Sequence, residues 1–124
     1  MGQSATLLAD GQVLVAGGWN GSDISPTVFA SAELYDPATG NWSFTGSMTV
    51  ARAGQNAVLL LNGEVLVGGG DGKTPSTAEL YNPATGAWTA TGSMTRARNA
   101  KLVLLPNGEV LAADGDNNTP STAE

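Results

Sequence analysis

Residues 32–42, Ala-Glu-Leu-Tyr-Asp-Pro-Ala-Thr-Gly-Asn-Trp, return at residues 78–88 as Ala-Glu-Leu-Tyr-Asn-Pro-Ala-Thr-Gly-Ala-Trp. The offset is 46 residues, measured from Tyr35 to Tyr81. A repeat with a period of about 20 to 50 residues indicates an array in which each copy is one supersecondary unit that packs on its neighbours. The repeat therefore limits the fold class before any local propensity is considered.

The repeat extends on both sides of this stretch. Downstream, Thr-Gly-Ser-Met-Thr at residues 45–49 returns at residues 91–95, and an Ala-Arg pair follows each copy. Ser-Thr-Ala-Glu at residues 76–79 also returns at residues 121–124, so we expect the third copy to be incomplete. Upstream, a turn dipeptide followed by Val-Leu occurs in three copies, which are residues 9–15, 61–67 and 106–112.

Each copy is predicted to form four short antiparallel strands. Apolar runs at residues 57–61 and 65–67 flank Asn62-Gly63, a dipeptide typical of a type I′ hairpin, in which both central residues need a positive φ. The third strand is expected to end at Tyr35-Asp36-Pro37, because proline cannot donate to a central ladder. After a Pro-Ala-Thr-Gly loop the fourth strand begins at Trp42. The prediction is two full sheets and the opening hairpin of a third.

The composition fits this prediction. The chain has 124 residues, of which 41% are hydrophobic and 13% are charged, with 17 glycines and 6 prolines. The apolar content is sufficient for a core, while the glycines and prolines disfavour long helices and favour short strands joined by tight turns. We therefore expect one small globular domain.

Charge and residue content argue against several classes of function. The net charge of −6 argues against nucleic-acid partners, because affinity for phosphates comes from clustered Lys and Arg. No apolar run is long enough to suggest a membrane segment.

Without Cys or His the chain lacks thiolate ligands and the commonest general base, so we expect no cofactor. The first ten residues do not resemble a signal peptide, and the compartment stays open, with a secreted or cell-surface parent as one alternative.

These residues resemble the kelch repeat. The shared features are a glycine pair after the second strand, Tyr-Asp-Pro or Tyr-Asn-Pro after the third, a tryptophan six or seven residues further on, and then Met and Arg. The residue pattern of the repeat is most similar to bacterial kelch repeats of the galactose oxidase-like group, and the resemblance covers nearly the whole chain. It implies an all-β fold of kelch-type β-propeller blades, each a four-stranded antiparallel sheet, in an incomplete ring of about two and a half blades.

The resemblance also implies an arrangement of the sheets. In kelch proteins the first strand of each blade lines the central channel and the fourth lies on the rim, so the outer strands would begin at Trp42 and Trp88. The third copy departs from the pattern, because Ala112-Ala113-Asp114-Gly115 stands where a glycine pair is expected. The expected blades are residues 5–48, residues 55–94 and a truncated blade at residues 100–124.

Residues that recur at the same place in each copy are expected to pack neighbouring blades, because every blade has the same faces to bury. The recurring arginines are expected to donate hydrogen bonds to carbonyl groups of the neighbouring blade. A stacking platform for sugars, built from the aromatic residues, is the alternative. The recurring residues are Tyr35, Trp42, Met48 and Arg52, with their equivalents Tyr81, Trp88, Met94 and Arg98.

Binding residues are expected where the copies differ, since such positions are not required by the repeated packing. The segment between the second and third strands is longest in the first copy, where residues 19–31 correspond to residues 71–77 of the second. Trp19 and Phe29 in this segment either contact a ligand or cap the blade. The candidate binding residues are Trp19, Asn20, Asp23, Phe29, Asp71, Lys73, Asp116 and Asn117.

Residues 114–118, Asp-Gly-Asp-Asn-Asn, place oxygen ligands at alternate positions, as a calcium loop does. However, Thr119 occupies the position of the required glycine, and the sequence ends before a bidentate glutamate. The equivalent Asp71-Gly72-Lys73 does not keep the acidic pattern either. A polar loop is therefore favoured over a metal site, and no metal is predicted.

Three functions remain. The favoured one is a non-catalytic, non-enzymatic propeller segment that binds a protein or a carbohydrate (glycan) through loops on one face. The alternative is a fragment of a galactose oxidase-like copper enzyme; that family builds its site from Tyr, His and a Cys crosslinked to Tyr, so the site would lie outside this segment. The third is a purely structural role, as an excised or engineered propeller piece. Because about two and a half blades cannot close a ring of about four to eight, we expect self-association or further blades of a longer parent chain.

Overall fold

The structure of the chain, a computed structural model, describes residues 1–22, 24–70, 76–94 and 101–113. Within these ranges the chain forms strands and turns and no helix. The strands are β1 (Ser4–Leu7), β2 (Val13–Ala16), β3 (Trp19–Ser22), β4 (Ser25–Val28), β5 (Ala32–Asp36), β6 (Asn41–Phe44), β7 (Asn56–Leu59), β8 (Val65–Gly68), β9 (Ala78–Asn82), β10 (Ala87–Ala90), β11 (Lys101–Leu104) and β12 (Val110–Ala113).

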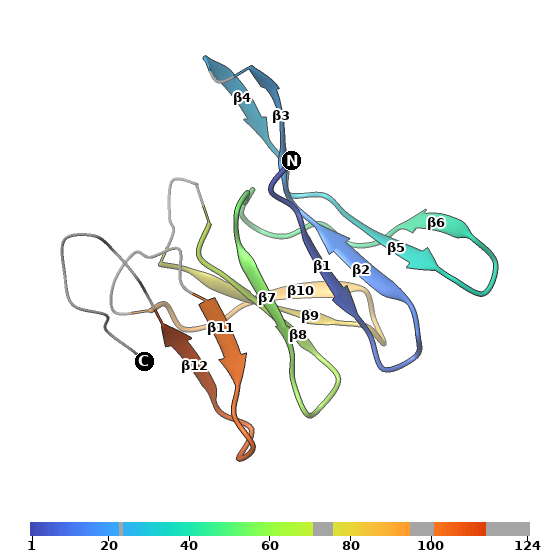
Figure 1. Ribbon diagram of the computed structural model, residues 1–124, viewed down its shortest axis with the longest axis vertical. Coiled ribbons are helices and arrows are strands. Elements are labelled where there is room, and N and C mark those ends of the chain that lie inside the picture. Colours follow the sequence, from blue (N-terminus) through green and yellow to red (C-terminus); the bar gives the residue numbers. More distant parts are fainter. Residues whose placement is uncertain (23, 71–75, 95–100, 114–124) are drawn as a thin grey trace.

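These strands form antiparallel sheets that follow the copies of the repeat (Figure 1). The first sheet has the order β1-β2-β5-β6 and the second has the order β7-β8-β9-β10. The third copy contributes the hairpin β11-β12, and a separate hairpin, β3-β4, interrupts the first copy. The predicted all-β fold of four-stranded antiparallel sheets is confirmed.

The two four-stranded sheets share one register. In each sheet the tyrosine of the third strand pairs with the tryptophan of the fourth and with a valine of the second, which in turn pairs with a leucine of the first. Directly paired residues point to the same face of a sheet, so the repeat places the same side chains on the same face. The row is Leu7, Val13, Tyr35 and Trp42 in the first sheet and Leu59, Val65, Tyr81 and Trp88 in the second.

The turn between β7 and β8 differs from the predicted type I′ turn. The Leu60 N–H donates to the Glu64 carbonyl oxygen (2.8 Å) and the Gly63 N–H to the Leu60 carbonyl oxygen (3.0 Å), which leaves a three-residue loop. Gly63 has a φ of 87°, whereas no described residue other than glycine has a positive φ. Asn62 therefore does not take the left-handed conformation that type I′ requires, and its Oδ1 accepts the Glu64 N–H instead (3.0 Å). The same loop geometry recurs in the other copies, at Gly11 and Gly108.

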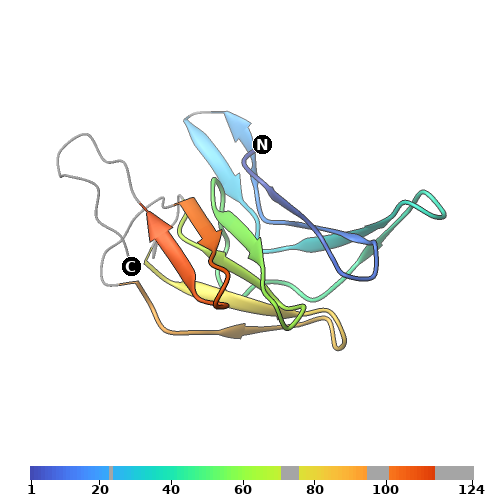
Figure 2. The same ribbon diagram turned by 60° about the horizontal axis from the view of Figure 1, so that its bottom comes forward.

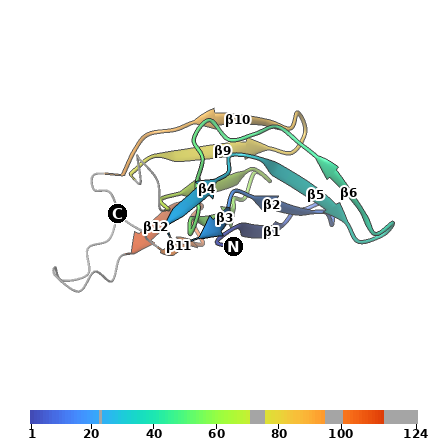
Figure 3. The same cartoon turned by 90° about the horizontal axis from the view of Figure 1, so that it is seen from above.

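The sheets follow one another in chain order, as the colour sequence shows (Figure 2). The first strands of the copies, β1, β7 and β11, are neighbours in space, while β6 and β10 lie toward the opposite side (Figure 3). This is the arrangement expected of blades around a common centre. The main core lies between the first and second copies and consists of Leu8, Leu14, Ala16, Ala32 and Met48 from the first and Val65, Val67 and Tyr81 from the second.

The repeat supplies a matched pair of glycines to test this stacking. A Cβ on Gly46, after β6, would collide with the Gly86 carbonyl oxygen in the turn of the second sheet, whereas a Cβ on the equivalent Gly92 would meet nothing within 4 Å. We expect Gly46→Ala to lower the free energy of unfolding by about 1–3 kcal/mol through overpacking. Gly92→Ala should change it by less than about 0.5 kcal/mol. Urea denaturation measures both, and equal losses would contradict the stacking.

Candidate functional site

The segment between β6 and β7, residues 45–55, lies across the second sheet and is called the linker below. Near its start, the Thr45 and Tyr81 hydroxyl groups share a hydrogen bond (2.8 Å). The Trp88 Nε1–H donates to the carbonyl oxygen of Gly46 (2.7 Å). Both aromatic residues of the second copy are thus bound by the chain that leaves the first sheet. The prediction that they pack neighbouring blades is confirmed for this pair.

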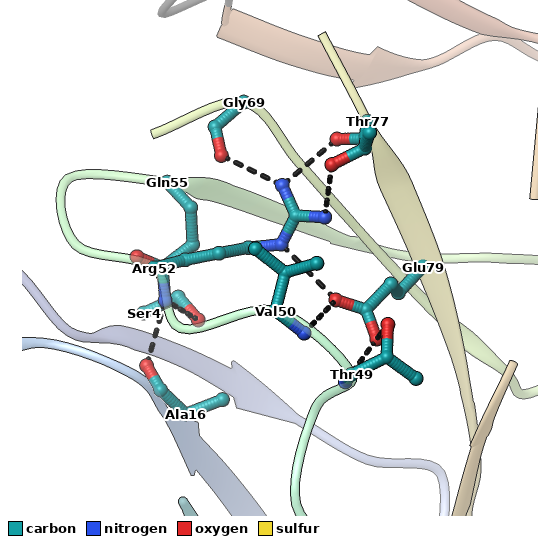
Figure 4. Close-up of polar contacts among 9 residues, drawn as sticks. All are labelled: Ser4, Ala16, Thr49, Val50, Arg52, Gln55, Gly69, Thr77 and Glu79. Atoms are coloured by element: carbon teal, nitrogen blue, oxygen red, sulfur yellow. Dashed lines mark hydrogen bonds and ion pairs between the residues drawn. The ribbon is translucent and has the colours of Figure 1, made fainter. Parts of the chain in front are cut away.

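Arg52 lies near the end of the linker, and its side chain is the centre of a network of polar contacts (Figure 4). Its buried guanidinium donates to the second copy through Nη1 to the carbonyl oxygens of Gly69 (3.0 Å) and Thr77 (2.8 Å), and through Nη2 to Thr77 Oγ1 (2.6 Å). A guanidinium suits this site because its planar fork presents several donors in fixed directions. The expected hydrogen bonds to neighbouring carbonyl groups are confirmed for Arg52, whereas Arg98 lies outside the described residues.

Glu79 of β9 completes this network. Its Oε2 accepts from Arg52 Nε (3.2 Å) and from the Val50 N–H (3.3 Å), and its Oε1 accepts from the Thr49 N–H (2.6 Å) and hydroxyl (2.7 Å). An ionised side chain is buried at tolerable cost only when it is paired and hydrogen-bonded in this way. Both side chains are buried and bound to the fold, which indicates that the pair joins the two sheets rather than performs chemistry.

Gln55 joins the inner strands of the same two sheets. Its Nε2 donates to the Ala16 carbonyl oxygen (2.7 Å) and to Ser4 Oγ (3.4 Å) of the first sheet. Its Oε1 is buried without a hydrogen-bond partner among the described residues. The linker therefore holds the sheets together along their whole width, from the outer tryptophan to the inner edge.

The β3–β4 hairpin is the candidate binding element, because it has no counterpart among the described residues of the other copies. Residues 19–31 contain this paired hairpin, with Trp19 opposite Val28 and Asn20 opposite Thr27. It projects away from the stacked sheets (Figure 1). Asn20 and Thr27 share one face and are exposed, whereas Trp19 and Val28 on the other face are half-buried.

The base of the hairpin is fixed to the linker. The Gly18 N–H donates to the Arg52 carbonyl oxygen (2.7 Å), and the Arg52 N–H donates to that of Phe29 (3.1 Å). The Phe29 N–H donates to the Gly18 carbonyl oxygen (2.9 Å), and the Trp19 N–H to that of Met1 (2.7 Å). Arg52 therefore binds the second sheet with its side chain and the hairpin with its backbone.

The structure describes three of the eight predicted binding residues and brings them together at this hairpin. Asn20 is exposed, whereas Trp19 and Phe29 are half-buried at the base, where the indole of Trp19 lies against Gly2. Trp19 and Phe29 thus anchor the hairpin. Ile24, an apolar residue at the tip, is almost fully exposed and was missed because a single apolar residue in a polar segment gives no pattern. The candidates outside the described residues are Asp23, Asp71, Lys73, Asp116 and Asn117.

An apolar hollow of about 320 Å³ lies between the second sheet and the β11–β12 hairpin. Its lining includes Leu66, Ala78, Met94 and Val110. In the repeat these residues correspond to Leu14, Ala32, Met48 and Val65, all of which are buried in the core between the first and second copies. The hollow is therefore the equivalent of an inter-sheet core and not a separate ligand site.

The described residues contain neither a cluster of metal-ligating side chains nor a helix that could span a membrane. Within the described ranges no three His, Cys, Asp or Glu residues converge as metal ligands. The whole sequence lacks Cys and His, so the chain offers neither the thiolate nor the imidazole ligands that copper favours. The part of the chain that the structure describes also contains no helix long and apolar enough to cross a bilayer.

The repeat also supplies a matched control for the Arg52–Glu79 pair, because Glu33 occupies the position of Glu79 in the first sheet. We expect Glu79→Gln to lower the free energy of unfolding by about 3–5 kcal/mol, since it leaves the buried Arg52 uncompensated. Glu33→Gln should cost less than about 0.5 kcal/mol. Chemical denaturation measures both, together with Arg52→Ala and the double variant. Strictly additive costs of Arg52→Ala and Glu79→Gln would contradict the pairing.

Comparison with known proteins agrees with this geometry. Residues 3–49 match the Kelch motif family model. No curated protein sequence matches the chain. Among solved structures, the fold is similar to that of a fungal alcohol oxidase of the AA5 family in complex with copper, with a TM-score of 0.79 and 21% sequence identity. The alignment covers 95% of this chain and 28% of the oxidase chain. The first copy thus carries a Kelch motif, and the chain as a whole has the fold of kelch-type β-propeller blades.

Proposed function

We propose that this chain is a non-catalytic segment of a kelch-type propeller that binds a protein or a carbohydrate through the β3–β4 hairpin. The bacterial, galactose oxidase-like character of its repeats belongs to the same proposal. The observation that carries it is the hairpin itself. Every other described strand serves the repeated plan of stacked sheets, whereas β3 and β4 pair only with each other.

The fixed base and the exposed side chains of the hairpin support a binding role. Two backbone hydrogen bonds, from the Gly18 N–H to the Arg52 carbonyl oxygen and from the Arg52 N–H to that of Phe29, fix its base to a buried part of the fold, so its position is defined. Asn20 and Thr27 present exposed polar groups side by side on one face, and Ile24 exposes an apolar side chain at the tip. A projecting element on a rigid base is a common way for a scaffold to present contact residues.

The second candidate function is a fragment of a copper oxidase, which the likeness to the AA5 alcohol oxidase favours. The residues of this chain do not fit a copper centre, because neither His nor Cys occurs in the sequence. In this alternative the active-site residues lie outside the segment, which aligns with 28% of the oxidase. The chain would then contribute only scaffold and surface to such an enzyme.

Exchange of the segment between the second and third strands tests the proposal. Replacing residues 19–31 with Asp-Gly-Lys-Thr-Pro-Ser-Thr, the sequence of residues 71–77, gives the first copy the segment of the second. We expect the original chain to bind a ligand on a glycan array and the exchanged chain to bind it at least about tenfold more weakly, with unfolding midpoints within a few degrees of each other.

Binding that survives the exchange would contradict the role of the hairpin. If the original chain binds no glycan on the array, the carbohydrate form of the proposal is contradicted. The protein form is then tested by comparing the affinity of the original and the exchanged chain for each protein ligand separately. Oxidation of galactose by the chain in the presence of copper and oxygen would overturn the non-catalytic assignment.

A further inference from the structure

One face of the first sheet carries the side chains that the second sheet buries. The row of paired residues already described puts the leucine, valine, tyrosine and tryptophan of each copy on one face. Glu33 pairs with Phe44 and so shares that face in the first sheet, as Glu79 pairs with Ala90 in the second. We call the face of the first sheet the open face; it is defined by Leu7, Val13, Glu33, Tyr35, Trp42 and Phe44.

The two equivalent faces differ in exposure. In the second sheet Val65 and Tyr81 are 0% exposed, and Trp88 is packed against the core. On the open face the equivalent Val13 and Tyr35 are half-buried and Trp42 is 56% exposed, and Leu7 is 64% exposed where Leu59 of the second sheet is half-buried. Phe44 is 82% exposed, but its equivalent Ala90 is exposed as well and does not distinguish the two faces. Sequence and register are nearly the same on both faces, so the difference lies in what covers them. Apolar side chains that are buried in one copy and left more exposed in the other indicate a surface that a further packing partner would cover.

The covering of the second sheet indicates which chemistry would fit the open face. Tyr81 is bound by the hydroxyl of Thr45, and Glu79 is bound by Thr49, Val50 and Arg52. All four groups come from the linker, whose sequence from residue 45 is Thr-Gly-Ser-Met-Thr-Val-Ala-Arg. Glu33 has no ion pair within the described residues, although it stands at the position of Glu79. The open face therefore presents the same carboxylate and the same aromatic pair without the linker that binds them.

We infer that the open face is a docking site for the linker of one more sheet of the same kind, and that an arginine of this linker pairs with Glu33. Continuity with the existing interface argues for this occupant, because the first and second sheets already bind each other through that set of contacts. The inference rests on the propeller-segment part of the proposed function and is independent of what the β3–β4 hairpin binds.

The repeat also fixes where such a linker joins the chain. Gly2-Gln3 corresponds to Gly54-Gln55, and the Gly54 N–H donates to the Gly2 carbonyl oxygen (2.7 Å), so the equivalent segments run side by side. In this register Met1 takes the place of Ala53, and the equivalent of Arg52 would directly precede Met1. An N-terminal extension of Thr-Gly-Ser-Met-Thr-Val-Ala-Arg therefore places its arginine as Arg52 is placed before Ala53.

The extended chain tests the inference by thermal unfolding. We expect the extension to raise the Tm by about 3 °C or more over that of the same extension ending in Ala. Glu33→Gln should remove most of this gain, because the gain comes from pairing with that carboxylate. Glu64→Gln, in the turn after β7, is the matched control and should leave the gain unchanged. A lysine at the end of the extension should recover only part of it, since it lacks the planar fork.

The results that would overturn the inference are distinct from a failure of the proposed function. Equal Tm values for the Arg and Ala extensions, or a gain that survives Glu33→Gln, would show that Glu33 accepts no linker arginine. If light scattering shows the unextended chain to be a dimer that Glu33→Gln dissociates, and the extension gives no gain, the face binds a second copy instead. None of these outcomes bears on ligand binding by the hairpin, which the segment exchange measures separately.

Discussion

The buried pair of Arg52 and Glu79 is the interaction on which the packing of the first sheet on the second depends. Burying two charges is favourable only when their remaining polar groups are also bound, and here the backbone and side chains of Thr49, Gly69 and Thr77 supply those partners. The pair therefore fixes the linker on the next sheet in one register. The apolar contacts around Tyr81 could tolerate small shifts, whereas this network could not.

The consequence is an assembly in which each sheet depends on its neighbour. A four-stranded sheet of this repeat has two apolar faces, and the structure shows one face of one copy covered and its equivalent in the other copy more exposed. Stability in such arrays is a sum of the units and the interfaces between them. Arg52 also holds the base of the β3–β4 hairpin through its backbone, so the contact that orders the sheets also positions the candidate binding element.

Much of the fold could be predicted from the sequence, because the repeat, the Tyr-Asp-Pro boundary and the glycine turns each act locally. The prediction of a type I′ turn at Asn62-Gly63 was wrong, because only Gly63 of the pair takes a positive φ and the loop has one residue more than the predicted two-residue loop. The hairpin at residues 19–31 was not recognised, since Pro26 and the absence of apolar alternation argue against strands. Glu79 was missed because its partner lies 27 residues away, although the recurrence of both Glu and Arg in each copy was a usable signal.

The central claim is that the linker after one sheet binds a separate neighbouring sheet. Side-chain contacts measured in solution test this claim most directly. Nuclear Overhauser effects from the ring of Tyr81 should reach the side chains of Thr45 and Met48. The ring of Tyr35 should show no such contacts to the equivalent Thr91 and Met94. Strong backbone contacts between β6 and β7, as in one continuous sheet, together with no contact between Tyr81 and Thr45, would contradict the account.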